Sequence, residues 1–299
     1  MGVALRKGFA EYSPIVDLLV RTRKKVKPVI IGGEPGVTPI LRWAGSKKKL
    51  LPLLLDHALK EFSGVYHEPF VGSGALFLQM NVKKSVLSDL NPHLMHAYKQ
   101  IKNHPAAVWE MLSKMPSNEE FYYSLRAMSW TTLNSIERTA RFLYLNRYCF
   151  NGVYRTNLNG DFNVSRGEGH LGIPSWDVFK AFSARLKKAS LAEADFESSI
   201  SKAAKGDFIY IDPPYVDLSK RNRGEYGVGS FGEDDVIRLA KITNQASRRG
   251  AKIMLSYSYS DELISLFKNW KVQTFSVQRS VSCDTSNRKL AKEILLTNY

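Results

Sequence analysis

The fold class follows from VYHEPFVGSGALFLQMNVKKSVLSDL, residues 65–90. A short apolar segment at 65–70 is followed by a glycine-containing turn, by helix-forming residues at 75–80 and by a second apolar segment at 85–90. This order predicts a strand, a tight turn, a helix and a second strand. A βαβ unit of this kind places the chain in the α/β class.

The rest of the chain extends this pattern around a long insert. Asn91 and Pro92 suit the cap and first position of a helix. Residues 104–145 are helical in character, and residues 146–172 are dense in Asn, Gly, Arg and aromatic side chains, which suits a hairpin-bearing loop region. Further strands are predicted at 207–211 and 252–256, further helices at 176–189, 234–248 and 261–269, and a terminal antiparallel hairpin at 272–280 and 293–298. The sequence thus predicts an α/β sheet domain whose two halves flank a mostly helical insert.

Composition narrows the classes of function. Lysine and arginine exceed aspartate and glutamate by 43 − 28 = 15 in the 299 residues, which favours a polyanionic partner such as nucleic acid. Cys149 and Cys283 form no CxxC pair, so neither a disulfide framework nor a zinc site is predicted, and a reducing cytoplasm is the simplest location. The apolar run at 50–55 is too short to cross a membrane. His93 and His96 are interpreted as surface residues, and no metal is expected.

The sharpest chemical signal is Asp212-Pro213-Pro214-Tyr215, directly after the apolar segment 208–211. Ligands of parallel sheets bind at the carboxyl ends of strands, which places Asp212 at a binding edge. Proline lacks a backbone donor and has a fixed φ, so the Pro213 carbonyl is a rigid acceptor. Asp212 and this carbonyl can accept both hydrogens of an exocyclic amine while Tyr215 stacks on a base that has been flipped out of its helix. The plainer interpretation is an edge strand that ends in a stiff turn.

A second signal is Glu68-Pro69-Phe70-Val71-Gly72-Ser73-Gly74-Ala75 at the predicted turn, where glycines let the backbone approach a ligand closely. Asp89 ends the following predicted strand, where a carboxylate can bind ribose hydroxyls. The spacing from Gly74 to Asp89 is shorter than in dinucleotide-binding proteins and a third glycine is missing, which disfavours NAD. Together these features predict a nucleoside-cofactor site. The alternative role for Asp89 is a helix cap.

These motifs, in this order, resemble those of the DNA adenine methyltransferase (Dam) family, N6-adenine-specific and of the D12 class or alpha group, from about residue 41 to the C-terminus. The segment Leu41-Arg42-Trp43-Ala44-Gly45-Ser46-Lys47 resembles the family's N-terminal cofactor motif, EPFVGSGA its glycine motif, Ser88-Asp89-Leu90-Asn91 its acidic motif, and DPPY its catalytic motif. The resemblance implies a Rossmann-like S-adenosylmethionine-dependent methyltransferase fold, with a mixed sheet that ends in an antiparallel hairpin and an inserted, mostly helical target-recognition domain.

The resemblance also implies the roles of individual residues. Catalysis would fall to Asp212, Pro213, Pro214 and Tyr215. Contacts with S-adenosylmethionine would come from Trp43, Ala44, Gly45, Lys47, Glu68, Pro69, Phe70, Gly72, Gly74, Asp89, Asp195, Phe196 and Asp212.

Residues 146–167 resemble the recognition hairpin of the family. By position, Phe150 would wedge into the base stack left by the flipped adenine, Val153 would contact a thymine methyl, and Arg155 would read a guanine edge with two hydrogen bonds, worth about 1–3 kcal/mol against a wrong base. Where many relatives have Asn-Val-Pro, this chain has Asn163-Val164-Ser165. The expected target is a short duplex motif, GATC or a variant. The expected DNA-binding residues are Arg42, Phe150, Asn151, Val153, Arg155, Asn157 and Ser165.

The expected division of the chain is an N-terminal extension at 1–39, a catalytic methyltransferase domain at 40–95 and 176–299, and a target-recognition domain at 96–175. The expected partner is double-stranded DNA, with no membrane and no metal. We further expect a monomer in solution and a cytoplasmic location, in a bacterial nucleoid or a phage-infected cell.

The expected reaction is a direct methyl transfer from sulfur to nitrogen without a covalent enzyme intermediate. Methylation of cytosine C5 would need a cysteine nucleophile beside a proline, and neither Cys149 nor Cys283 has such a neighbour. Two alternatives stay open. One is a cytosine-N4 methyltransferase, although relatives of that type more often have Ser at the position of Asp212. The other is a non-catalytic, sequence-specific DNA-binding protein with a methyltransferase fold.

Overall fold

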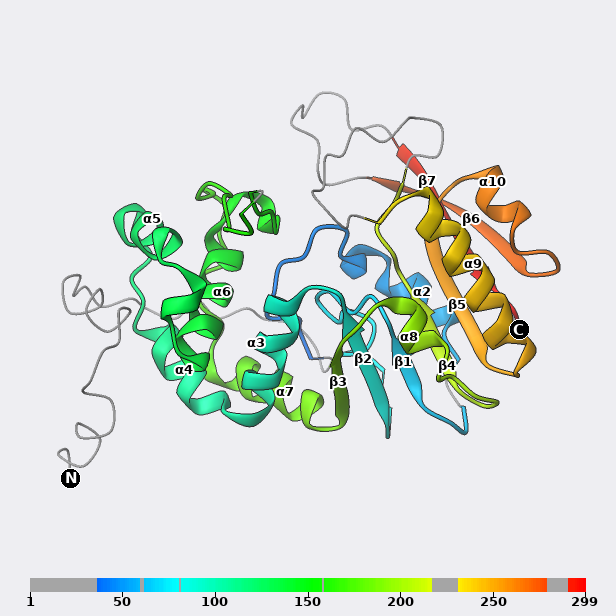
Figure 1. The fold of residues 1–299 in the computed structure, drawn as a ribbon, viewed down its shortest axis with the longest axis horizontal. Coiled ribbons are helices and arrows are strands. Elements are labelled where there is room, and N and C mark those ends of the chain that lie inside the picture. The colour runs from blue at the N-terminus through cyan, green and yellow to red at the C-terminus, as the bar shows by residue number, and fades with distance from the viewer. Residues whose placement is uncertain (1–36, 60–61, 81, 158, 217–230, 279–289) are drawn as a thin grey trace. The chain divides into compact units, whose positions relative to one another are not determined.

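The computed structural model describes residues 37–59, 62–80, 82–157, 159–216, 231–278 and 290–299 (Figure 1). Within these residues the chain divides into two units. The helical unit comprises the described residues up to Ala44 and His96–Lys187, and the sheet unit comprises those of Gly45–Met95 and Lys188–Tyr299. The expected extension as far as residue 36, the end of the 272–280 strand and Cys283 lie outside the described residues.

The described part of the sheet unit contains a seven-stranded sheet in the order β3-β2-β1-β4-β5-β7-β6. The first five strands in this order are parallel, and β7 runs antiparallel to both β5 and β6. Because β1 pairs with β2 on one side and β4 on the other, the carboxyl ends of these strands meet at a topological switch point, where open α/β sheets bind ligands. The strands are β1 (Tyr66–Glu68), β2 (Ser85–Asp89), β3 (Ala189–Glu193), β4 (Phe208–Ile211), β5 (Lys252–Ser258), β6 (Lys271–Gln278) and β7 (Leu290–Thr297).

Helices cover this sheet and complete its core. All four residues of β4 are buried, as expected for a central strand of a parallel sheet with both faces covered. One apolar face of α9 (Glu233–Arg248), with Val236, Leu239 and Ala240, packs in the same core cluster as Ile209 and Ile253 of β4 and β5. The other helices of this unit are η1 (Lys47–Leu50), α2 (Leu51–His57), α8 (Phe196–Ile200) and α10 (Asp261–Ser265).

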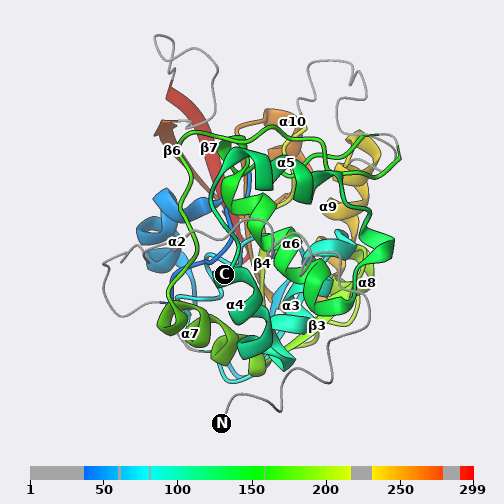
Figure 2. The ribbon, with the colours of Figure 1, turned by 90° about the vertical axis from the view of Figure 1, so that its left-hand side faces the viewer.

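The helical unit is built around α6 (Ser135–Tyr148), whose ribbon lies among the other helices of the unit (Figure 2). Eleven of its side chains are buried. This helix begins with a capping box in which the Asn134 side chain accepts from the Glu137 amide and the Glu137 carboxylate accepts from the Asn134 amide. It packs against α4 (Pro105–Ser113) and α5 (Glu119–Ala127). The unit also contains most of α3 (Pro92–Asn103), the short helices η2 (Trp130–Thr132) and η3 (Phe150–Gly152), and α7 (Trp176–Lys187).

Most predicted elements are confirmed. The β6–β7 hairpin pairs Phe275 with Glu293, and Asn91 caps α3 by accepting a 3.0 Å hydrogen bond from the Leu94 amide. The strand expected at 207–211 and the helix expected at 234–248 are present as β4 and α9.

Two expectations of secondary structure are wrong. Residues 75–80 form a series of turns rather than a helix. Some of their backbone amides donate a hydrogen bond to the carbonyl four residues earlier, as Leu78 does to Gly74. Others donate to the carbonyl three residues earlier, as Gln79 does to Leu76. This segment of six residues follows Gly74, whose φ is +65, and it is too short to offset the free-energy cost of helix nucleation. In addition, Ala189 does not end α7 but begins β3, a strand that the sequence did not predict.

The structure also places a helix differently from the expected division of the chain. The whole of α7 belongs to the helical unit, where Trp176 packs on Trp109 with 5.5 Å between ring centroids, whereas the sequence assigned residues 176–187 to the catalytic domain. The helical unit also takes in residues 40–44. None of the helices in the described ranges has the length and apolar character that a membrane crossing requires.

Candidate active site

The centre of the candidate site is the segment that follows β4. The Asp212 carboxylate lies 2.8 Å from the Lys47 ammonium, whose side chain is only 8% exposed. The same ammonium lies 4.6 Å from the centroid of the Tyr215 ring and donates to the Gly45 carbonyl at 3.2 Å. The structure therefore brings together four residues that the sequence had selected from opposite ends of the chain: Gly45, Lys47, Asp212 and Tyr215.

Both partners of Asp212 bind the same oxygen atom. Lys47 and the Ser256 hydroxyl contact Oδ1, at 2.8 and 2.9 Å. No described residue donates a hydrogen bond to Oδ2 of Asp212 or to the carbonyl of Pro213. Two neighbouring acceptors at the end of β4 are thus left open to a ligand by the described residues.

Strands β5 and β7 supply site residues that the sequence analysis missed. Ser256 of β5 links Asp212 to the Tyr210 hydroxyl, and Glu293 of β7 accepts a 3.1 Å hydrogen bond from the Tyr215 hydroxyl. Burial, aided by the charges of Asp212 and Glu293, raises the pKa of Tyr215 far above its usual value, so the phenol stays protonated. A glutamate directly before an apolar run, Glu293-Ile294-Leu295-Leu296, was the signal that could have identified one of these residues.

The glycine segment after β1 turns sharply and is fastened to β2. Gly72 and Gly74 have φ values of +45 and +65, which favour glycine, and the Gly72 amide donates to Asp89 Oδ2 at 3.1 Å. Asp89 Oδ1 accepts from the Asn91 amide at 3.0 Å. Asp89 therefore stabilises the local turn through both of its carboxylate oxygens. The residue that caps the following helix is Asn91.

Glu68, at the end of β1, is buried and accepts a 2.8 Å hydrogen bond from the Tyr66 hydroxyl. The pKa of Glu68 is raised to about 8, because the effect of burial outweighs that of the bond from Tyr66, which lowers the pKa, and the negative charge of Asp212 adds a smaller rise. Below about pH 8 Glu68 therefore mostly carries a proton, and the carboxylate of Asp212 is the group at this edge that would favour a cationic ligand.

Next to this edge lies a cluster of aromatic rings. Phe70 stacks on Phe196 with 5.5 Å between centroids, and Phe231 contacts both rings edge-on. The Arg238 guanidinium lies 4.9 Å from the centroid of Phe196. Phe196 is the first residue of α8, and Asp195 caps that helix by accepting from the Glu197 amide at 2.9 Å.

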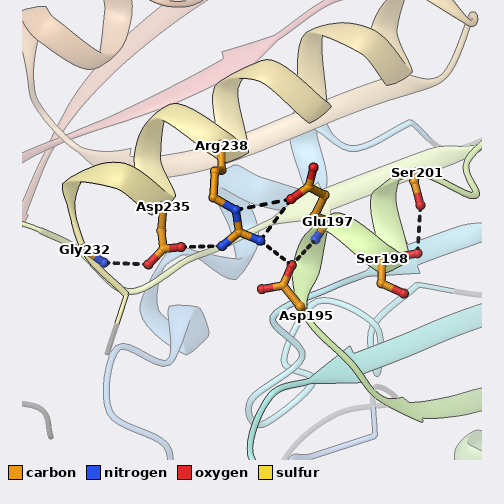
Figure 3. Close-up of polar contacts among 7 residues, drawn as sticks. All are labelled: Asp195, Glu197, Ser198, Ser201, Gly232, Asp235 and Arg238. Carbon is orange, nitrogen blue, oxygen red and sulfur yellow. Dashed lines mark hydrogen bonds and ion pairs between the residues drawn. The ribbon is translucent and has the colours of Figure 1, made fainter. Parts of the chain in front are cut away.

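Arg238 of α9 holds the start of α8 in place (Figure 3). Its guanidinium binds the carboxylates of Asp195 at 2.9 Å, Glu197 at 3.0 Å and Asp235 at 2.6 Å. The expected cofactor pair of Asp195 and Phe196 is therefore fixed by one arginine that the sequence analysis had not selected.

The N-terminal motif is divided between the two units. Trp43 lies in the helical unit and stacks on Tyr154, with ring centroids 5.9 Å apart. Ala44 also belongs to the helical unit, and Gly45 begins the sheet unit. Arg42, expected to contact DNA, donates to the carbonyls of Cys149 and Gly169 at 3.4 and 3.2 Å, so it supports the loop region of its own unit.

The segment 146–167, which the sequence analysis expected to form the recognition hairpin, belongs to the helical unit. Bridges join Thr156 to Phe162 and Cys149 to Arg166 across it, and the Asn157 side chain accepts from the amides of Asn159 and Asp161 in its turn. Phe150 is 51% exposed, and Asn151 beside it has φ +53.

The other hairpin residues that were expected to bind DNA differ in exposure and in hydrogen bonding. Arg155 is exposed and donates through Nε to Asn163 at 2.8 Å, which leaves its two terminal nitrogens without a partner among the described residues. Ser165 is exposed, and its carbonyl accepts from the Phe150 amide at 2.8 Å, whereas Val153 is half-buried. The described residues contain no group of three or more histidine, cysteine or acidic side chains that could hold a metal ion.

Comparison with known proteins gives a consistent picture. The family model of the D12 class N6 adenine-specific DNA methyltransferases matches residues 43–282. A Type II methyltransferase of Lactococcus lactis subsp. cremoris is 32% identical over 87% of this chain and 95% of its own length. A Type II methyltransferase of Methanocaldococcus jannaschii is 33% identical over 88% of this chain and 99% of its own, and a DNA adenine methylase of Vibrio cholerae is 29% identical over 85% and 94%.

Proposed function

Because the chain belongs to the D12 class of N6 adenine-specific DNA methyltransferases, and is therefore an enzyme that methylates adenine in DNA, we propose that its methyl donor is S-adenosylmethionine. Three features of the sheet unit fit this cofactor: the glycine turn at Gly72 and Gly74, the aromatic rings of Phe70 and Phe196, and the acidic carboxyl edge. A sulfonium is a cation, and the carboxylate of Asp212, whose side chain is 18% exposed, would stabilise it electrostatically. The bound cofactor would supply the electrophilic methyl group.

The observation that carries the proposed mechanism is the pair of open acceptors after β4. The exocyclic amine of adenine has two hydrogens, and Asp212 Oδ2 and the Pro213 carbonyl can each accept one of them. These bonds orient the nitrogen and keep its electron density available for attack on the methyl group, so no covalent enzyme intermediate is needed. The nitrogen must then lose one of its hydrogens as a proton, which can pass to Asp212 Oδ2 or to solvent. Pro214 holds the turn rigid, and the Tyr215 ring offers a stacking surface to the base.

Adenine inside a duplex cannot reach these acceptors, so the base must be flipped out. Phe150 is suited to fill the space that it leaves, because a large aromatic side chain half exposed on a loop can insert into a base stack. The terminal nitrogens of Arg155, which no described residue binds, match the O6 and N7 acceptors of guanine. We propose that these residues, with Asn151, Val153, Asn157 and Ser165 around them, select a short duplex motif, GATC or a variant.

The test is incubation of the purified protein with tritiated S-adenosylmethionine and duplex DNA, digestion to nucleosides, and mapping of modified positions by single-molecule sequencing. The expected result is N6-methyladenine at one motif, and no label with Asp212→Ala, which removes an acceptor. Asp234→Ala, which removes an exposed carboxylate from α9, is the matched control and should keep full activity. Label in N4-methylcytosine, or duplex binding without any label, would overturn the proposal.

A further inference from the structure

Glu293 is a buried carboxylate at the candidate site that the mechanism above leaves without a role. It lies on β7, paired with Ser258 of β5 and Phe275 of β6, and only 6% of it is exposed. The next three residues of the strand, Ile294, Leu295 and Leu296, are all buried apolar side chains. A carboxylate in such a position costs free energy unless it makes strong hydrogen bonds, so its contacts indicate its purpose.

The contact at the site is a bond from the Tyr215 hydroxyl to Glu293 Oε2, 3.1 Å long. The Tyr215 ring packs at a tilt on Tyr257, with 4.9 Å between ring centroids. The Lys47 ammonium lies 4.6 Å from the centroid of the Tyr215 ring. The ring is therefore held by contacts along its length and by a charged acceptor at its tip. Hydrogen bonds to an ionised acceptor are stronger than neutral ones, and an acceptor on a strand paired on both sides moves little.

We propose that Glu293 is the positioning residue that fixes the plane of the Tyr215 ring for stacking against the flipped adenine. This inference rests on the proposed role of Tyr215 in stacking on the base. In this role Glu293 acts on the base through the tyrosine hydroxyl and not by direct contact with adenine or cofactor.

The test compares Glu293→Leu, Glu293→Gln and Tyr215→Phe for kcat, for KM with duplex DNA and for S-adenosylmethionine affinity by calorimetry. Glu293→Leu and Tyr215→Phe each remove the bond and should lower kcat roughly tenfold, the effect of one charge-assisted hydrogen bond, with cofactor affinity unchanged. Glu293→Gln keeps an acceptor oxygen and should recover most of the activity. Glu262→Leu, the same substitution at an exposed position of α10, should match the wild type.

The double variant separates positioning from a general loss of structure. If both residues act through one bond, the double variant Tyr215→Phe with Glu293→Leu should be as active as the less active of the two single variants, because the bond can be lost only once. Losses that multiply in the double variant, or full activity of Glu293→Leu, would overturn the proposal. If Glu293→Leu does not fold, Tyr215→Phe decides alone, since its full activity would also overturn it. Failure of the proposed function would appear differently, as a wild-type protein that methylates no adenine.

Discussion

At the scale of single residues, the acidic edge of the sheet makes stability depend on pH through Glu68. Burial raises its pKa in the folded protein to about 8, from an ordinary value of 4.5. The folded state therefore holds the proton more tightly than the unfolded chain does. The stability that Glu68 contributes is fully present below pH 4.5 and is lost as the pH rises through 8.

Glu68→Gln should remove this dependence, because an amide cannot ionise and its oxygen still accepts from the Tyr66 hydroxyl. We expect the variant to gain stability relative to the wild type as the pH is raised from about 4.5 to about 8. Thermal unfolding without cofactor across this range measures the difference. Parallel curves for the two proteins would contradict the prediction.

Phe150 leads to a second prediction at this scale. Phe150→Ala should methylate a fully paired target roughly tenfold more slowly, because unstacking one base step costs a few kcal/mol and the alanine cannot fill the gap. On a duplex in which the target adenine is mispaired, flipping is easier and the variant should recover. Single-turnover rates on the two duplexes make the comparison. Leu171→Ala, at another exposed apolar residue of the helical unit, should be unaffected on both. Equal losses on both duplexes would argue against a wedge.

At the scale of elements, Arg238 ties the N-terminus of α8 to that of α9, because its guanidinium binds carboxylates at both helix ends. Arg238→Met keeps a side chain over the Phe196 ring but releases Asp195. Since Arg238 is 43% exposed, solvent screening limits the contribution of each pair to stability to about 1 kcal/mol or less. We therefore expect a small change in melting temperature but a several-fold weaker affinity for S-adenosylmethionine.

Arg248→Met, at an exposed position in the last turn of α9, is the control for Arg238. It removes the same charge without touching α8, so its cofactor affinity should equal that of the wild type. Calorimetric titration of both variants distinguishes the outcomes. Unchanged affinity in Arg238→Met would show that α8 keeps its place without the arginine.

The elements also show where sequence-based prediction stops. The β3 segment, Ala-Ser-Leu-Ala-Glu, contains no β-branched or aromatic residue, and local propensity favours a helix there. It forms a strand because its backbone pairs with β2 over five residue pairs, Ser85↔Ala189 through Asp89↔Glu193. Conversely, β4 and α9 were predicted correctly because a short apolar run and a strongly amphipathic repeat are local signals.

At the scale of the whole molecule, an excess of fifteen positive charges predicts strongly salt-dependent DNA binding. If about six phosphates are contacted, duplex affinity should fall about 10³-fold between roughly 50 and 200 mM salt. Arg155→Ala should lose discrimination at one base pair, while the slope of log affinity against log salt changes by about one or less. Fluorescence anisotropy at several salt concentrations measures both quantities. A flat salt dependence would exclude phosphate contacts as the main source of affinity.

The sequence alone determined the fold class, the glycine turn, Asp89 and the Asp212-Pro213-Pro214-Tyr215 segment to which we assign catalysis. Each of these depends on residues that are neighbours in the chain, and strand and turn patterns place them at one sheet edge. Only the tertiary structure decided that Lys47 pairs with Asp212, that Arg238 fixes Asp195, and that Glu293 binds Tyr215 across a sequence separation of 78 residues. The partner of a buried charge is chosen by the strands and helices that pack around it, and that packing leaves no local mark in the sequence.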